Sequence, residues 1–165
     1  MEVDVVRAIK ECLHLMNIVA GVALLVRLAI NGSILRNIIT AATSSDMERV
    51  FFGVGKLIDD TFLVVEVFEC PNVAGNPRIE FIAEPLCEYR VFRYAEEKGL
   101  EIVAVIHSHP APPKPSTSDL KGMRLWSIPW LIVDSLSGSY RAWILVDNGI
   151  VEVNVTLTTE NSKTV

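Results

Sequence analysis

The chain has 165 residues, half of them hydrophobic, and therefore has the size and composition of one globular domain. Its formal net charge of −5 argues against nucleic acid as the main partner, because phosphate binding needs a basic surface. Three widely spaced cysteines, Cys12, Cys70 and Cys87, form no Cys-x-x-Cys pair, which argues against a thiolate zinc knuckle. They predict reduced thiols in a cytoplasmic protein, although a hyperthermophilic source would leave room for one disulfide.

The N-terminal residues combine an amphipathic segment with a short apolar run. Residues 2–16 place their apolar side chains on one helical face, which predicts an amphipathic helix that packs on the domain or forms a dimer contact. The run from Ile18 to Val26 is only nine residues long, whereas a membrane-spanning helix needs about 20. No basic region precedes it, as a signal peptide would require. We expect an N-terminal extension over 1–20, a domain over 21–165 and no membrane partner.

Strands and helices alternate along the rest of the chain. No repeat or linker divides it, so the pattern predicts one α/β domain with a mixed, strongly curved sheet flanked by helices. The predicted elements are a buried strand over 22–30, a helix over 33–42 capped by Ser33, a hairpin over 49–70 that turns near Asp59 and Asp60, a short strand over 78–85, a helix over 86–98, a strand over 100–109, and strands over 130–135, 140–146 and 150–157.

The segment VIHSHPAPPKPSTSDL, residues 105–120, concentrates the candidate chemistry of the chain. Side chains on a strand alternate between faces, so His107 and His109 point the same way and can bind one zinc ion. The proline-rich loop 110–115 has little conformational freedom to lose and can hold Asp119 near both histidines. Two histidines, a carboxylate and an open position are typical of a catalytic zinc site.

Each part of this segment also has a purely structural interpretation. A lone His-x-His pair usually binds no metal, and Ser108 on the opposite face is expected to be structural. Ser116 is a candidate helix N-cap, with Asp119 three residues later near the positive end of the helix dipole. The capping role is compatible with metal binding, and the conjunction of the parts favours the metal site.

The same residues resemble the signature of the JAMM (MPN+) zinc metalloproteases, in which His-Ser-His-Pro or His-Thr-His-Pro precedes a short loop and Ser-x-x-Asp. The resemblance covers roughly residues 22–157 and implies a compact prokaryotic member with the JAMM/MPN-like, cytidine-deaminase-like fold. It implies that His107, His109 and Asp119 bind zinc. It also implies that Ser116 stabilises the oxyanion of the tetrahedral intermediate.

The loop between His109 and Ser116 has six residues, one fewer than is usual in the family. The shorter loop leaves Thr117 and Ser118 as alternative donors to the oxyanion. A family glutamate, further upstream, acts as general base on the zinc-bound water, in a pattern like Glu-x-x-Gly-x-x-x-Gly.

The family pattern points to Glu48, which stands seven residues before Gly55. The bulky Phe51 occupies a position that is usually small. A solvated carboxylate at a strand start is the structural alternative for Glu48, and Glu66 and Glu84 are rival candidates for the base.

By resemblance, the chain is a zinc-dependent isopeptidase that hydrolyses the bond after the Gly-Gly tail of a ubiquitin-like or sulfur-carrier protein. Two alternatives stay open, a non-catalytic MPN scaffold that binds partners and a zinc hydrolase of a small amide. Replacing Glu48 with Gln would not affect a scaffold, and a comparison of peptides with folded conjugates would identify a small-amide hydrolase. A homodimer is also left open.

Overall fold

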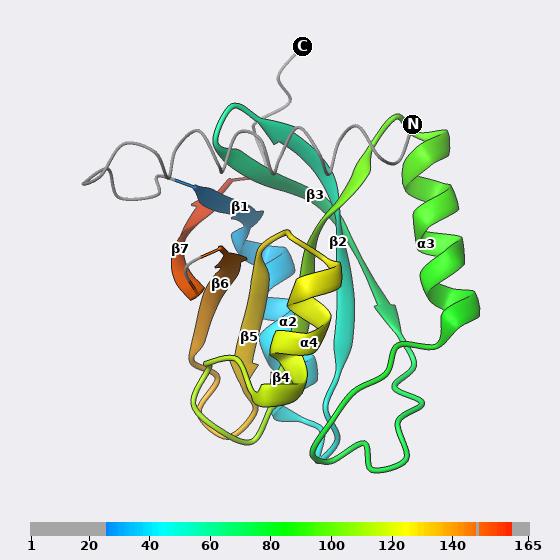
Figure 1. The fold of residues 1–165 in the computed structure, drawn as a ribbon, viewed down its shortest axis with the longest axis vertical. Coiled ribbons are helices and arrows are strands. Elements are labelled where there is room, and N and C mark those ends of the chain that lie inside the picture. Colours follow the sequence, from blue (N-terminus) through cyan, green and yellow to red (C-terminus); the bar gives the residue numbers. More distant parts are fainter. Residues whose placement is uncertain (1–25, 148, 160–165) are drawn as a thin grey trace.

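The fold is described by a computed structural model for residues 26–147 and 149–159. The helix predicted over 2–16, the proposed extension 1–20 and Cys12 lie outside the described residues, as does the beginning of the strand predicted over 22–30. Within the described part, strands and helices form one mixed α/β arrangement (Figure 1), as the sequence predicts. No helix in that part is long and apolar enough to cross a membrane.

One mixed sheet contains the strands of the described residues. In chain order they are β1 (Arg27–Asn31), β2 (Val50–Ile58), β3 (Thr61–Cys70), β4 (Glu101–His109), β5 (Trp130–Asp134), β6 (Tyr140–Val146) and β7 (Gly149–Thr158). The hydrogen-bonded order is β1-β3-β2-β4-β5-β6-β7, and β1 also pairs with β7, so the sheet closes on itself. The β4–β5, β1–β3 and β1–β7 pairs are parallel and the others are antiparallel. A mixed and strongly curved sheet is therefore confirmed.

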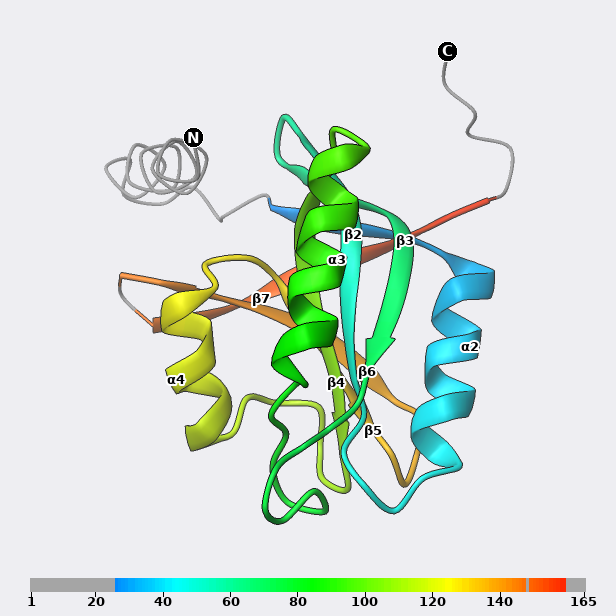
Figure 2. The same cartoon turned by 90° about the vertical axis from the view of Figure 1, so that its right-hand side faces the viewer.

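Three helices flank the sheet in the described part of the chain: α2 (Gly32–Thr43), α3 (Pro85–Glu97) and α4 (Thr117–Leu125). Figures 1 and 2 show α2 and α4 on opposite sides of the strands, with α3 along a third side. In α2 the buried residues Leu35, Ile38 and Ala42 recur in steps of three and four, which places one apolar face on the strands. This packing leaves the C-terminal end of β4 open to the loops that carry the candidate site.

The cap of α2 differs from the prediction. The helix begins at Gly32, and its N-cap is Asn31, whose side-chain oxygen accepts a hydrogen bond of 2.7 Å from the Ser33 amide. Asn is as good an N-cap as Ser, and the residue that comes first at the end of β1 takes the position. The prediction of Ser33 as the cap is therefore wrong, while the helix itself is confirmed.

The hairpin of β2 and β3 turns at Asp59 and Asp60, as predicted. Asp59 adopts a positive φ of 53°, which Asp tolerates better than most residues. The ladder shifts register between Val54 and Gly55. A Cβ atom at Gly55 would lie 1.8 Å from the carbonyl oxygen of Leu63, so only glycine fits this close approach.

The bulky side chain of Phe51, at a position that is usually small in the family, is accommodated in the core with 5% of its surface exposed.

The strand predicted over 78–85 is not formed. Residues 71–84 are instead one loop between β3 and α3, called the 71–84 loop below, with a single β-bridge between Asn72 and Ala83. The amides of Ile79 and Glu80 both donate to the carbonyl of Asn76, which folds the chain into a turn. The backbone groups that a strand would offer to a neighbour are thus bonded within the loop.

A disulfide joins Cys70 at the end of β3 to Cys87 in the first turn of α3. The expectation of reduced thiols is therefore wrong for this pair, and the single disulfide that the sequence left open is formed. The disulfide therefore links the end of β3 to the start of the 13-residue helix α3, across the 71–84 loop. The sequence could not reveal the pairing, because only the fold brings the two Cα atoms to 5.7 Å.

Candidate metal centre

Strand β4 places His107 and His109 on one face in the middle of the sheet. It lies between β2 and β5, and His107 is opposite Val50 on one neighbour and Ile132 on the other. Both imidazoles are buried, with 0% and 7% of their surface exposed. Their ring centroids are 5.5 Å apart, as expected for residues two positions apart on a strand.

Three ring nitrogens in this pair are buried and have no hydrogen-bond partner among the described residues: His107 Nδ1, His107 Nε2 and His109 Nδ1. His107 Nε2 lies 3.2 Å from Asp119 Oδ1, without the alignment of a hydrogen bond. One ligand atom from each of His107, His109 and Asp119 lies within 4.8 Å of the others. Unpaired buried nitrogens cost free energy, and a metal ion would supply their partner. Two imidazoles and a carboxylate are a donor set suited to zinc.

The N-terminus of α4 fixes Asp119. The Ser116 amide donates to Asp119 Oδ2 over 2.7 Å, and the Asp119 amide donates to Ser116 Oγ over 3.1 Å. This reciprocal pair is the predicted capping arrangement, and it leaves Asp119 Oδ1 facing His107. Burial opposes ionisation of Asp119, but His107 and the Ser116 groups outweigh it and lower the pKa to about 2. The carboxylate is therefore charged and oriented before any ligand binds.

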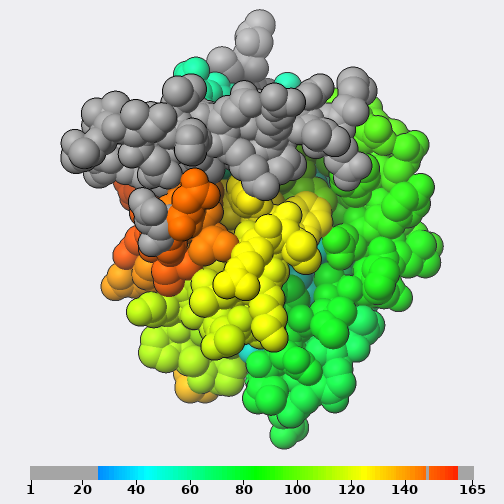
Figure 3. Space-filling model, in the orientation of Figure 1, coloured from blue at the N-terminus to red at the C-terminus, as the bar shows by residue number. Residues whose placement is uncertain are grey.

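The 110–115 loop is held against the sheet at two points. The Trp143 indole on β6 donates to the carbonyl of Pro113 over 2.8 Å, and His109 Nε2 lies 3.3 Å from the carbonyl of Lys114. Helix α4 then packs closely on the sheet, because a Cβ at Gly122 would lie 2.5 Å from the Trp130 ring. Figure 3 shows α4 in yellow beside the green loop and helix segments on the same face. Six residues therefore suffice to bring α4 to the histidines.

Glu48 lies just before β2 and is buried, with 6% of its surface exposed. Burial is the main cause that raises its pKa to about 7, and the charges of Asp119 and Glu80 add to the increase while His107 opposes it. The next residue, Arg49, is bonded in both directions to Ser108, which lies between the two histidines. Ser108 therefore has the structural role predicted for it, and its bonds to Arg49 hold the backbone next to Glu48 against β4.

The two rival carboxylates have other surroundings. Both oxygens of Glu66 accept from the Tyr94 hydroxyl of α3, at 2.8 and 2.9 Å. Glu84 is the N-cap residue of α3 and makes no side-chain capping bond. Glu48 is buried, and the charges of His107 and Asp119 both act on its pKa.

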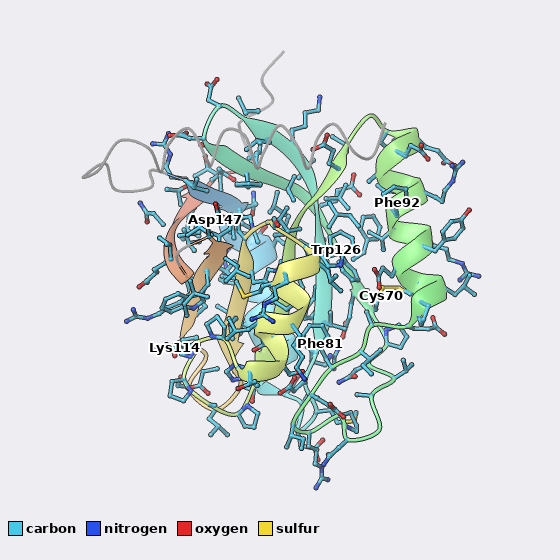
Figure 4. The ribbon with its side chains drawn as sticks, in the orientation of Figure 1. Cys70, Phe81, Phe92, Lys114, Trp126 and Asp147 are labelled. Carbon is cyan, nitrogen blue, oxygen red and sulfur yellow. A yellow bond between two sulfur atoms is a disulfide. The ribbon has the colours of Figure 1, made fainter. Side chains whose placement is uncertain are left out.

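Aromatic residues that the sequence analysis did not single out surround His107. The Phe81 ring from the 71–84 loop stacks on the imidazole with centroids 4.7 Å apart, and Trp130 meets it edge-on at 5.8 Å. Figure 4 labels Phe81 in this loop. Neither residue has a recognisable sequence signal, because an aromatic residue within an apolar segment is usually part of the core. The two rings pack against an imidazole that is fully buried.

Comparisons with known proteins agree with this fold and show the family of the chain. The model of a family described as prokaryotic homologs of the JAB domain matches residues 34–146. The chain therefore belongs to this family, as a compact prokaryotic member of the JAMM/MPN class, and the predicted resemblance is confirmed.

Two curated relatives are similar in sequence. A protein of Pyrococcus furiosus named desampylase is 39% identical over 73% of this chain and 84% of its own length. A protein of Thermus thermophilus named probable TtuB-protein conjugate cleaving protease is 37% identical over 42% of this chain and 47% of its own length.

Solved structures are similar in fold. The solution structure of a protein from Desulfitobacterium hafniense has a TM-score of 0.71 at 19% identity and covers 82% of this chain and 95% of its own. A Salinibacter ruber protein solved in solution has a TM-score of 0.60 at 23% identity with the same coverage. At these identities the likeness concerns the fold alone.

Proposed function

We propose that the chain is a zinc-dependent protease that hydrolyses the peptide or isopeptide bond after the Gly-Gly tail of a ubiquitin-like or sulfur-carrier protein. The observation that carries this proposal is the convergence of His107, His109 and Asp119, with unpaired buried imidazole nitrogens, beside the buried carboxyl group of Glu48. A scaffold has no need for this costly arrangement, since buried polar groups without partners destabilise a fold.

In this proposal His107, His109 and Asp119 hold the zinc ion. When bound, zinc supplies a Lewis acid that lowers the pKa of water and polarises a carbonyl. Asp119 is already ionised and oriented by the cap of α4, and the two imidazoles come from a central strand. The site therefore needs little reorganisation to accept a metal, which favours tight binding.

Glu48 is the proposed general base. A pKa of about 7 in the metal-free protein means that its carboxylate can accept a proton near neutral pH and return it to the leaving amine. Burial, the largest cause of the raised pKa, also increases the driving force for proton transfer from water to the carboxylate. The amine must be protonated when the bond breaks, and the Glu48 carboxyl group can deliver to it the proton that it took from water.

Ser116 is the proposed donor to the developing oxyanion. Its Oγ accepts the Asp119 amide, so the hydroxyl hydrogen is available to a substrate carbonyl at the N-terminus of α4. The helix dipole favours negative charge at this end. Thr117 and Ser118 follow within the first turn of the helix, so the six-residue loop leaves the choice of hydroxyl to experiment.

The names of the relatives support a protein conjugate as the substrate. One relative is named a desampylase, and the other is named for cleaving TtuB-protein conjugates. A narrow glycine tail also suits a metal centre enclosed by Phe81 and α4, because glycine allows the closest approach of a backbone.

The test is a cleavage assay with the zinc-loaded protein and a ubiquitin-like protein joined through its Gly-Gly tail to a lysine. We expect cleavage after the second glycine, and a loss of at least about 100-fold for Glu48→Gln, because general-base catalysis contributes about 10²–10⁴ in rate. Free Gly-Gly peptides and small amides form the comparison. Cleavage of the small amides alone would indicate the small-amide hydrolase, and no cleavage of any substrate would support the scaffold.

A further inference from the structure

The side-chain amide of Asn72 joins the 71–84 loop to the backbone of Glu48. Asn72 Nδ2 donates to the carbonyl of Glu48 over 2.9 Å and to that of Glu80 over 3.0 Å, with a longer contact of 3.4 Å to Pro77. Asn72 Oδ1 accepts from the amides of Ala74 and Ile82 at 3.1 and 3.0 Å. One side chain thus satisfies backbone groups from both ends of the loop and from Glu48, two residues before β2.

This arrangement admits one orientation of the amide. Its oxygen faces two N–H groups and its nitrogen faces carbonyl oxygens. A flipped amide would place its NH2 group against the two N–H donors and its oxygen against the carbonyl acceptors. An aliphatic residue would leave these backbone groups without partners, and Asp would offer no donor to the carbonyls. The position therefore requires both halves of an amide.

Glu48 depends on these contacts because it lies outside the sheet ladder. The pairing of β2 with β4 begins at Val50, so the ladder does not bond the peptide groups of Glu48. The Glu48 amide donates instead to the carbonyl of Pro77 over 2.7 Å, and its carbonyl accepts from Asn72. Both backbone groups of the proposed base are therefore bonded to the 71–84 loop.

The same loop also reaches the candidate metal site. Phe81 stacks on His107 at a centroid distance of 4.7 Å, and its neighbour Ile82 donates its amide to Asn72. Glu80, whose carbonyl is bonded to Asn72, is one of the charges that acts on Glu48. The Asn72 amide thus connects three parts of the molecule: the proposed base Glu48, the 71–84 loop, and the Phe81 segment of that loop that packs on His107.

We propose that Asn72 is a positioning residue, which sets the Glu48 carboxylate against the His107 side of the site by fixing its backbone to the 71–84 loop. This inference rests on the proposed function, in which Glu48 is the base. Asn72 touches no reacting atom, and it acts through Glu48. A general base must be within hydrogen-bond reach of its proton, and a displacement of about 1 Å can cost about 100-fold in rate.

The experiment compares Asn72→Ala and Asn72→Asp with Asn76→Ala in the zinc-loaded protein. Asn76 lies in the same loop, is exposed, and its side chain makes no hydrogen bond within the part of the chain that the structure describes. The measured quantities are kcat and KM for a Gly-Gly conjugate, zinc per chain, and hydrogen exchange of the Glu48 amide. The Val105 amide, bonded to Pro129 at 3.1 Å, is the internal reference for exchange.

We expect kcat of both Asn72 variants to fall by about 10- to 100-fold, with KM changed by less than about threefold and zinc content unchanged. Exchange of the Glu48 amide should accelerate at least about tenfold relative to Val105, while Asn76→Ala matches the wild type. Asn72→Asp keeps the acceptor side of the network, so it is evaluated alone if Asn72→Ala does not fold.

An unchanged kcat in the folded Asn72 variants, or unchanged exchange at Glu48, would overturn the inference. A fall in kcat that follows a loss of zinc would also overturn it, because the effect would then be on the metal site. Failure of the proposed function is distinguishable, since the wild type itself would not cleave the conjugate. The exchange measurement remains valid in that case and tests the contact between Asn72 and Glu48 by itself.

Discussion

The segment from Val105 to Asp119 and the 71–84 loop meet at His107, yet they encode their contributions differently. In the first, a strand, a proline-rich loop and a helix cap supply three candidate metal ligands within thirteen residues, His107 to Asp119. In the second, the contributions are the stacking of Phe81 and the amide of Asn72, which act on residues elsewhere in the chain. The candidate metal ligands are thus local in the sequence, whereas the contacts that the 71–84 loop makes with His107 and Glu48 join distant parts of the chain.

This difference has a physical origin. A metal site needs particular donor atoms, and few residue types carry them, so a short motif is informative. A positioning contact needs only an amide or a ring at the right place, which many residues could supply in another fold. The two regions should therefore respond to substitution in different ways.

The largest expected effect, beyond the ligands and the base, is that of Ser116→Ala in the first region. Removing one donor to an oxyanion costs about 10²–10³ in kcat, and the lost cap should lower the free energy of unfolding by about 1 kcal/mol. Steady-state kinetics and denaturant unfolding measure the two effects, with zinc analysis to verify that the zinc content is unchanged.

Thr117→Ala and Ser118→Ala are the matched controls for Ser116→Ala. Both lie in the first turn of α4. We expect kcat within about twofold of the wild type, since Ser116 is the proposed donor to the oxyanion. A large loss in either control, together with an active Ser116→Ala variant, would assign the oxyanion donor to that residue.

The next effect concerns the charge of Glu48 in the metal-free protein. Its folded pKa of about 7 exceeds the ordinary 4.5, so the folded state binds the proton more tightly. The stabilisation is complete below pH 4.5 and is lost as the pH rises towards 7. Glu48→Gln cannot ionise, and it should therefore be more stable than the wild type at pH 8, by up to about 3 kcal/mol.

Denaturant unfolding at pH 4 and pH 8, with a chelator present, measures this difference. The free energies of unfolding of Glu48→Gln and the wild type should be similar at pH 4 and diverge at pH 8. A difference that is the same at both pH values would contradict a buried carboxyl group with a raised pKa.

The disulfide at the ends of the 71–84 loop should affect stability by a similar amount. Cys70 and Cys87 are 17 residues apart, and replacing both with Ser should lower the free energy of unfolding by about 3 kcal/mol. Equilibrium unfolding with and without a reductant tests this. The wild type should become as unstable as the double variant under reducing conditions, and a wild type insensitive to the reductant would argue against the bond.

The smallest effect is expected for Phe81→Ala, which removes the ring stacked on His107. Aromatic pairs contribute about 1 kcal/mol, which corresponds to roughly fivefold weaker zinc binding. Competition with a chromophoric chelator measures the affinity. Phe92→Ala on α3 is the control, because that ring is 37% exposed, and its removal should leave zinc affinity unchanged. Equal losses of zinc affinity in the two variants would show that Phe81 has no specific effect on zinc binding.

Much of the fold could be predicted from the sequence, since hydrophobic periodicity marks the strands and helices that pack on the core. The helix over 33–42 and the strand that ends at His109 are examples. The strand expected over 78–85 fails for a physical reason, because its backbone groups bond to a turn and to the Asn72 side chain. Propensity describes a segment alone and does not register such tertiary bonds.

The candidate site shows the same limit. His107, His109 and Asp119 could be found because their spacing matches a strand, a stiff loop and a capped helix. Phe81 could not, since the sequence does not distinguish a ring that packs on a candidate ligand from one in the core. The pairing of Cys70 with Cys87 was likewise beyond the sequence, because it depends on how α3 returns to β3.

Zinc content is the most direct test of the central claim, which is that His107, His109 and Asp119 form a metal centre. Elemental analysis would be applied to the purified wild type and to the variant His107→Ala with Asp119→Ala, after zinc is supplied to both. We predict about one zinc per wild-type chain and none above background in the variant. Equal zinc in the two proteins, or none in either, would contradict the account.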